Sequence, residues 1–317
     1  MIKKIQPLAD YMVEKAREYG AGCEKVFVAV SGGIDSATVA AILVRAFGKE
    51  NVIGLYRDIR SDPKHFADAL LLEKALGFKL VRLDLNDEYD SILAKIKTEF
   101  DRLGLPWSDE GTKEAFETGR MGAYESYKSR AMTPIAGFVS KMIDNGRGRI
   151  FGTGNGEEDG LLRYFDKYGD GAVDNNLLAG LNKAEVRCLA RYLGVPERLV
   201  TKKPSADLQG NGDRQNDEDS LIAWASKLGY DVKISYGAPD GSEEGNVAWA
   251  MKEDIKNGIV TGVRSGKFGC SELTELYGRE RAELILFLRE VERSTRHKAS
   301  PPVGTKREEL LAVGLVD

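Results

Sequence analysis

The residues best suited to chemistry are the six of SGGIDS at 31–36. They follow the apolar run VFVAV at 26–30 and precede a helical pattern that begins at Ala37, so the sequence predicts a strand, a tight loop and a helix. Gly32 and Gly33 let the backbone bend sharply and bring its N–H groups against an anion, and the N-terminus of the helix favours the same negative charge. We interpret this segment as a phosphate-binding loop.

Three polar side chains of the loop specify which phosphate chemistry we expect. Ser31 and Ser36 add hydroxyl donors, and Asp35 offers a carboxylate to a magnesium ion that neutralises phosphate oxygens. The alternative is an ordinary glycine-rich turn after a strand, because a lone glycine motif is a weak signal. SGGIDS lacks the lysine of the common GxxxxGK[ST] loop and resembles the loop of the ATP pyrophosphatase (PP-loop) superfamily, whose members split ATP into AMP and pyrophosphate.

Composition limits the class of partner. The chain has 317 residues, 42% of them hydrophobic, and a net charge of −4 without a long run of Lys and Arg, so nucleic acid is not the expected partner. The N-terminal 20 residues form a charged amphipathic pattern rather than a signal peptide, and we expect no membrane span and a cytoplasmic location. Three cysteines and two histidines leave carboxylates to bind any metal, which favours magnesium.

Apolar runs and helical patterns alternate along the chain. Strands are expected at 25–30, 51–56, 78–85 and 149–154. The fold class is therefore α/β, a doubly wound parallel sheet flanked by helices. Ligands of such sheets bind beyond the carboxyl ends of the strands, so SGGIDS and the GTGN at the fourth strand should share one cleft.

The remaining elements complete a single domain over 1–317. Residues 129–143 carry an apolar stripe that we assign to core packing, and Asn182 with Glu185 predicts a capped helix to which we assign no chemistry. The glycine-rich segment at about 235–270 is expected to be an insertion or lid around a short helix. One long charged helix is expected over about 271–294.

A second polar cluster follows the fourth predicted strand. It reads GTGNGEEDGLLRYFDKYGDGAVD at 152–174, and KKPSADL follows a helix later, at 202–208. Glycines among carboxylates and lysines are costly to order unless a ligand binds there, but charged runs are usually solvated surface. From these residues alone, a binding loop and a solvated surface both stay open.

Taken in order, several motifs identify the chain as similar to ammonia-dependent NAD synthetases. They are SGGIDSA, GTGNxxE, KYGDG, LARYLGVP, KKPSADL, a DED run at 217–219 and RHKxxPP near the C-terminus. The resemblance spans nearly the whole chain, and KYGDG with KPSADL narrows it from the superfamily to this family.

The resemblance implies a two-step amide synthesis. The nicotinate carboxylate of deamido-NAD attacks the α-phosphorus of ATP to give an adenylate and pyrophosphate, and ammonia then displaces AMP to give NAD. ATP and Mg²⁺ are the implied cosubstrate and cofactor, and relatives are usually homodimers. The chain has no room for the amidase domain of glutamine-dependent members, so we expect free ammonia or ammonia from a partner glutaminase.

The resemblance also assigns roles to particular residues. It makes Asp35 and Glu158 the magnesium ligands, and makes Asp35, Lys202, Asp170 and Asp174 the catalytic group. The implied nucleotide-binding residues are Ser31, Gly32, Gly33, Asp35, Ser36, Arg130, Thr153, Lys167, Lys202, Ser205, His297 and Lys298.

Several of these assignments have structural alternatives. Glu157 or Asp159 could face the metal in place of Glu158, Asp170 and Asp174 could cap turns, and His297 could be an ordinary surface histidine.

The segments that the resemblance assigns to binding of the carboxylate substrate depart from the family pattern. ETGRMGAYESYKSRAM at 117–132 replaces a segment rich in paired arginines, Ala172 stands for a glycine, and RHKASPP lacks an arginine. Two further hypotheses therefore stand beside NAD synthesis. One is a divergent ligase that amidates another carboxylate, and the other is a nucleotide-binding protein without catalysis. A tRNA-thiolating enzyme is disfavoured because paired reactive cysteines and a basic surface are missing from the sequence.

Overall fold

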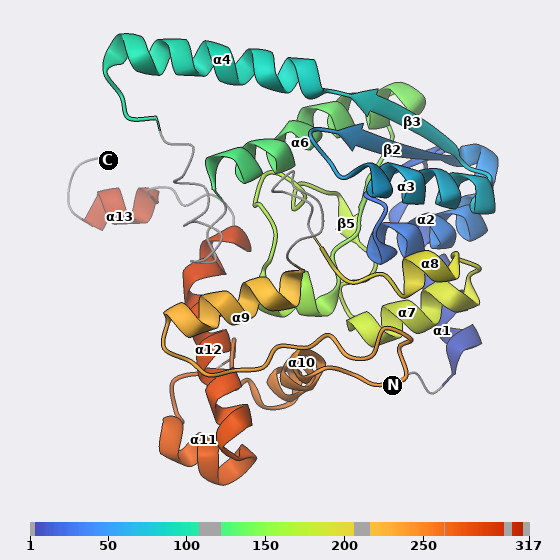
Figure 1. The fold of residues 1–317 in the computed structure, drawn as a ribbon. Helices are drawn as coiled ribbons and strands as arrows, with labels where there is room; N and C mark the ends of the chain where they lie inside the picture. The colour runs from blue at the N-terminus through green and yellow to red at the C-terminus, as the bar shows by residue number, and fades with distance from the viewer. Residues whose placement is uncertain (1–3, 108–121, 206–215, 263, 301–305, 313–317) are drawn as a thin grey trace.

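The computed structural model describes residues 4–107, 122–205, 216–262, 264–300 and 306–312. Parallel strands form a sheet in the order β3-β2-β1-β4-β5 (Figure 1). The strands are β1 (Val26–Ala29), β2 (Val52–Asp58), β3 (Lys79–Asp84), β4 (Ile150–Gly152) and β5 (Asn175–Asn176). The chain builds outward from β1 to β3 and then returns to the other side of β1, so the strand order reverses between β1 and β4. A doubly wound sheet binds its ligand at such a point.

Helices cover both faces of this sheet, which confirms the predicted fold class. One face carries α1 (Ile5–Tyr19), α2 (Ile34–Phe47), α3 (Pro63–Leu76), α7 (Lys183–Tyr192) and α8 (Glu197–Val200), and the other carries α6 (Ala123–Ile143). Alternation along β1 separates the two cores, because Val26 and Val28 pack toward α2 while Phe27 packs toward α6. The short helix η1 (Lys49–Asn51) leads into β2.

The predicted apolar stripe at 129–143 lies within α6. Met132, Ile135, Val139 and Ile143 pack against the sheet, as the helical spacing predicted. Met142 is wrong as a core residue, since it is 67% exposed. It lies at the edge of the stripe, three residues after Val139 and one residue before α6 ends at Ile143.

Helix α4 (Asn86–Leu103) extends beyond the sheet (Figure 1). At its start the rings of Tyr89 and Tyr127 lie 5.3 Å apart, and near its end the ring of Phe100 contacts Trp107, which in turn contacts Tyr124 of α6. Further along, Ile92 and Ile96 are 40% and 39% exposed. The middle of this helix therefore presents partly exposed apolar side chains.

The C-terminal part forms a second hydrophobic cluster. It contains α9 (Asp217–Lys227), α10 (Asn246–Asn257), α11 (Cys270–Tyr277) and α12 (Arg279–Thr295), followed by η3 (Arg296–Lys298) and α13 (Arg307–Ala312). The single helix predicted over 271–294 is wrong, because Gly278 at φ 81° separates α11 from α12.

The segment at 235–270 contributes apolar side chains to this cluster. The short helix that we predicted there is α10, and Val247, Ala250, Met251 and Ile259 are buried. Its role as a lid and the single-domain organisation stay predictions.

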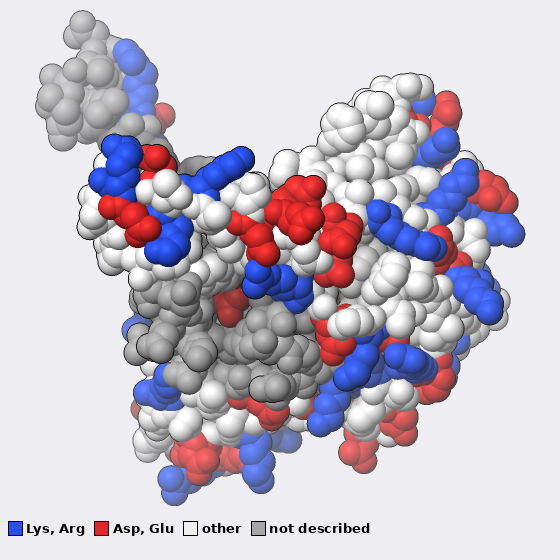
Figure 2. All heavy atoms as spheres, turned by 45° about the horizontal axis from the view of Figure 1, so that its top comes forward, with Lys and Arg blue, Asp and Glu red and all other residues white. Residues whose placement is uncertain are grey.

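Charges of both signs are interspersed over the face drawn in Figure 2. Among the described residues, no helix is both long and apolar enough to cross a bilayer.

Candidate active site

The loop at 31–36 connects β1 to α2 at the point where the strand order reverses. Gly32 adopts φ 77°, and a Cβ at this position would lie 2.5 Å from the carbonyl oxygen of His65. Only glycine meets both the left-handed conformation and the close approach. Ser36 fixes the loop from inside, because its Oγ accepts from the N–H of Ser31 at 3.2 Å and donates to the carbonyl of Gly33 at 3.1 Å.

A cleft of about 290 Å³ opens at the carboxyl ends of β1 and β4. The cleft is lined by residues of the phosphate loop, of the GTGN motif and of the KKPSADL motif. They include Ser31, Asp35, Ser36, Thr153, Lys202 and Ser205. The sequence placed these residues in one cleft, and the structure brings them together. Residues 206–208 of the KKPSADL motif lie outside the described residues.

Asp35 and Glu158 meet on one ammonium group. Nζ of Lys183 lies 2.7 Å from Oδ2 of Asp35 and 2.7 Å from Oε1 of Glu158, and the Lys183 side chain is 1% exposed. Burial lowers the pKa of Lys183, but the two carboxylates outweigh burial and raise it above its ordinary value. Burial and the neighbouring Asp35 also raise the pKa of Glu158, which the Lys183 charge opposes. The two predicted metal ligands therefore lie side by side around one positive charge.

Asn155 and a short π-helix, η2 (Gly156–Leu162), orient these carboxylates. Oδ1 of Asn155 accepts from the N–H groups of Glu157 and Glu158, each at 3.0 Å, and so caps the π-helix. Its Nδ2 donates to Asp35 at 3.2 Å and to Glu158 at 2.8 Å. π-Helices often occur at functional sites.

The π-helix separates its three consecutive acidic residues. Glu158 faces Asp35, whereas Glu157 turns away and accepts a hydrogen bond from the backbone N–H of Lys183. Burial raises the pKa of Glu157 to about 8. Asp159 lines the cleft, and its carboxylate occupies the space that a Cβ on residue 154 would need, so glycine is required there. Of the three candidates, Glu158 is the one that shares Lys183 and Asn155 with Asp35, and its role as a metal ligand stays a prediction.

Lys202 lines the cleft and ties the phosphate loop to α3. Its Nζ donates to the carbonyl of Gly32 at 3.3 Å and to Oδ2 of Asp68 at 2.9 Å, and lies 2.9 Å from Nδ1 of His65. Asp68 is buried and also pairs with Arg198 at 2.8 Å. Lys202 is thus pre-positioned beside the loop rather than free in solvent.

Asp170 lines the cleft, as do Ser129, Met132 and Thr133 of α6. Its Oδ1 accepts from Oγ of Ser129 at 2.9 Å and from the N–H of Asp166 at 2.8 Å. The protein packed around it raises the pKa of Asp170, although its carboxylate still faces the open cleft. Nε of Arg130 binds the carboxylate of the neighbouring Asp166 at 3.0 Å, and Arg130 is not among the residues that line the cleft.

The C-terminal residues of the prediction gather beside the KYGDG segment. Nζ of Lys167 donates to the carbonyl of His297 at 2.9 Å, and Nζ of Lys298 donates to the carbonyl of Arg163 at 3.1 Å. The His297 side chain is exposed. Burial lowers the pKa of Lys298, against the attraction of nearby aspartates. None of these three residues lines the cleft as the structure describes it.

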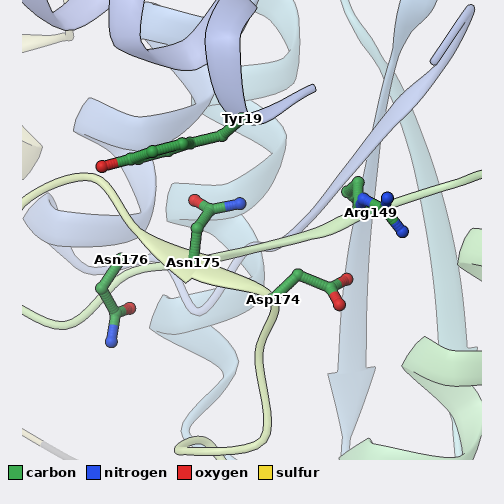
Figure 3. Close-up of a pocket in the computed structure, with 5 residues that line it drawn as sticks. All are labelled: Tyr19, Arg149, Asp174, Asn175 and Asn176. Atoms are coloured by element: carbon green, nitrogen blue, oxygen red, sulfur yellow. The ribbon is translucent and has the colours of Figure 1, made fainter. Parts of the chain in front are cut away.

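Asp174 lies in a different hollow, at the outer edge of the sheet (Figure 3). Its Oδ2 accepts from the N–H of Ile150 at 2.7 Å, and its side chain points toward Arg149, with Tyr19 and Asn175 nearby. In this structure Asp174 supports the start of β4 and is separated from the cleft that contains Asp35.

The family model for NAD synthase matches residues 4–228. A curated NH(3)-dependent NAD(+) synthetase of Pyrococcus horikoshii is 30% identical over 98% of this chain and 96% of its own length. This chain belongs to the NAD synthase family. A second such synthetase, of Methanococcoides burtonii, is 38% identical over 64% of this chain and 68% of the relative. The resemblance stated from the motifs is confirmed.

Solved structures of the same fold cover nearly the whole chain. An NMN synthetase from Francisella tularensis has a TM-score of 0.64 at 20% identity, covering 95% of this chain and 97% of that one. An NH3-dependent NAD synthetase from Campylobacter jejuni has a TM-score of 0.62 at 19% identity, covering 96% of this chain and 100% of the other. At these identities the likeness establishes the fold alone.

Two residues of this NAD synthase family site escaped the sequence prediction. We assigned no chemistry to the helix that begins at Lys183, yet the ammonium of this residue pairs with both predicted metal ligands. The available signal was a lysine directly after the capping Asn182, at the first position of α7. Asn155 belonged to the quoted GTGN motif, but its contacts to Asp35 and Glu158 are not readable from spacing.

Proposed function

We propose that this protein is an ammonia-dependent NAD synthetase, an AMP-forming ligase that uses ATP to convert the nicotinate carboxylate of deamido-NAD into the carboxamide of NAD. The observation that carries the proposal is the meeting of the SGGIDS loop, Asp35, Glu158 and Lys183 in one cleft of a chain that belongs to the NAD synthase family.

The phosphate loop, Lys183 and Lys202 would bind the triphosphate of ATP. Gly33 and Ile34 at the start of α2 line the cleft, and a helix N-terminus favours the negative charge that builds on departing pyrophosphate. Lys183 and Lys202 place two positive charges at the same cleft. Ser205 and Thr153 add hydroxyl groups to its lining.

Asp35 and Glu158 fit a magnesium ion that arrives with ATP. Mg²⁺ is commonly held by one or two carboxylates together with substrate phosphates, and this pair already shares a single cation, the Lys183 ammonium. When bound, Mg²⁺ would supply charge neutralisation on the phosphate oxygens. The protein orients the two carboxylates toward the same position. Asn155 contributes to this orientation, because its Nδ2 donates a hydrogen bond to each of them.

The acceptor would enter between β4 and α6 and place its carboxylate near the α-phosphorus. Attack by the carboxylate oxygen breaks the bond to pyrophosphate, and attack by ammonia then breaks the acyl–oxygen bond and releases AMP. Ammonium must lose protons on the way to the amide. Asp170, whose pKa is raised, faces this end of the cleft and would accept one of them.

A homodimer is part of the proposal. α4 exposes Ile92 and Ile96, and α6 exposes Phe138 and Met142, each 67% accessible, so both helices present apolar faces to a second copy. Mixed surface charge and a net charge of −4 do not favour nucleic acid as a partner. The cytoplasmic location stays a prediction.

Formation of NAD tests the activity. The enzyme is incubated with ATP, Mg²⁺, ammonium and deamido-NAD, and NAD, AMP and pyrophosphate are measured against the Asp35→Ala variant. We expect the three products in equal amounts, and at least a hundredfold lower rate for the variant, on the order of the effect of removing one charge-stabilising group. Turnover with nicotinate mononucleotide but not with deamido-NAD would assign a different acceptor. ATP binding without any turnover would support the non-catalytic alternative.

A further inference from the structure

The C-terminal cluster reaches the active site at one aromatic residue. Tyr236 is completely buried, and the Nζ of Lys183 lies 5.8 Å from the centroid of its ring. Residue 236 lies beyond the part of the chain that the family model matches, which ends at residue 228. A side chain from outside that core therefore contacts the ammonium that joins the two metal ligands.

The environment of Lys183 explains what such a ring can do. An ammonium group has three N–H donors, and the Nζ of Lys183 lies 2.7 Å from one carboxylate oxygen each of Asp35 and Glu158. Among the described residues, no third hydrogen-bond acceptor is recorded for this Nζ. A cation within about 6 Å of an aromatic centroid is attracted to the electron-rich face of the ring, most strongly where water is excluded. Tyr236 supplies that face behind the ammonium.

Tyr236 is itself fixed by several contacts. Its backbone N–H donates to Oε1 of Glu218 at 2.7 Å, and its carbonyl accepts from Nη1 of the buried Arg187 at 3.4 Å. Arg187 lies one helical turn after Lys183 on α7, so the same segment holds both the helix and its lysine. Met251 of α10 also packs close to Gly156 of the π-helix. The backbone of Tyr236 is thus held on both sides, and its ring is completely buried.

We propose that Tyr236 is a positioning residue for Lys183. Through its ring, the C-terminal cluster keeps the ammonium directed at Asp35 and Glu158 and ready for the phosphates of ATP. This inference rests on the proposed function only for the use of ATP, and it holds whichever carboxylate is the acceptor. The hydroxyl group of Tyr236 has no part in it, since that atom has no hydrogen-bond partner within the described part of the chain.

Electronic substitution of the ring tests this role without changing its shape. Phenylalanine and a series of increasingly fluorinated phenylalanines are introduced at position 236, and the affinity of the full-length protein for Mg²⁺ with a non-hydrolysable ATP analogue is measured by calorimetry. Because fluorine withdraws electrons from the ring face, we expect affinity to fall stepwise, by about 3- to 30-fold between Phe and the most fluorinated ring. Affinity independent of fluorination would overturn the proposal.

Two further variants separate positioning from loss of packing. Tyr236→Leu removes the ring, and Phe287→Leu removes a fully buried ring elsewhere in the same cluster. We expect both to lower the melting temperature but only Tyr236→Leu to weaken binding of the analogue. In a Lys183→Met background, Tyr236→Leu should cause no further loss of affinity. An equal loss from Phe287→Leu, or a full additional loss in that background, would refute the role of Tyr236. Since the acceptor is absent from this assay, an error in its identity leaves these outcomes unchanged.

Discussion

Lys183 is the residue at which the separate parts of the site meet. A fully buried lysine is rare unless it is paired, and here two carboxylates from different segments satisfy it. Removing one member of a buried ion pair leaves an uncompensated charge, which costs more than the pair contributes. The buried ammonium therefore organises Asp35 and Glu158 in addition to carrying charge for ATP.

Replacing Lys183 with methionine should keep the side-chain length and remove the charge. We expect kcat/KM for ATP, measured by pyrophosphate release, to fall by about 100- to 1,000-fold, because phosphate loses a positive partner and two carboxylates are left facing each other. Lys256→Met, at an exposed position on α10, is the matched control and should retain normal activity. A Lys183→Met enzyme with an unchanged kcat/KM would show that this ammonium is not used.

Glu157 predicts a pH dependence of stability. Its pKa in the folded protein is about 8, against an ordinary value of 4.5, so the native state binds the proton more tightly than the unfolded chain. Its contribution is fully present below about pH 4.5 and is lost as the pH rises through about 8, with a slope of up to about 1.4 kcal/mol per pH unit.

Urea denaturation across this pH range measures the effect. We expect Glu157→Gln to flatten the decline, since glutamine does not titrate, whereas Glu50→Gln at an exposed position should leave the slope unchanged. Identical slopes for Glu157→Gln and the unmodified protein would mean that Glu157 is ionised in the native state at neutral pH.

Among the elements, the β1–α2 loop depends most directly on backbone conformation. Gly32→Ala would introduce strain at φ 77° and a clash with the His65 carbonyl. We expect a loss of about 1–3 kcal/mol in the free energy of unfolding and a higher KM for ATP, because the loop must move away from α3. Gly266→Ala, where a Cβ meets no atom within 4 Å, should change neither quantity. Stability equal to that of the unmodified protein would contradict the strained geometry.

The elements also show what the sequence could predict. Long apolar runs with clear ends predicted the first four strands correctly. Asn182 and Glu185 predicted the start of α7, and the two reciprocal hydrogen bonds between these residues are both present. β5 was missed because two asparagines carry no periodicity, and the break at Gly278 was missed because one glycine does not reliably end a helix.

Contacts within the site could be predicted where the contacting residues belong to one short motif. They could not be predicted where the residues come from distant segments of the chain. Ser31, Asp35 and Ser36 lie in one loop, and the motif placed them together. The contacts of Lys183 with Asp35 and Tyr236 join segments 148 and about 50 residues apart, and only the packing of α7 against α2 and the C-terminal cluster creates them. Asp174 was assigned to the site through the motif, but its backbone position places it at the sheet edge.

For the whole molecule, the apolar faces of α4 and α6 predict self-association. Phe138→Asp should turn a dimer into a monomer, because an unpaired charge buried at an interface costs several kcal/mol. Light scattering coupled to size-exclusion chromatography gives the mass directly. Leu276→Asp on α11, where the leucine is 58% exposed, is the control and should remain dimeric. A monomeric unmodified protein at micromolar concentration would refute the proposed homodimer.

The most direct test of adenylation is to measure whether an oxygen atom of the deamido-NAD carboxylate is transferred to AMP. Deamido-NAD labelled with ¹⁸O in the nicotinate carboxylate is supplied with ATP, Mg²⁺ and ammonium, and the products are analysed by mass spectrometry. If the carboxylate attacks the α-phosphorus, AMP must carry one ¹⁸O atom, pyrophosphate none, and NAD must be formed. Unlabelled AMP, or labelled AMP without NAD, would contradict adenylation followed by amidation of this acceptor.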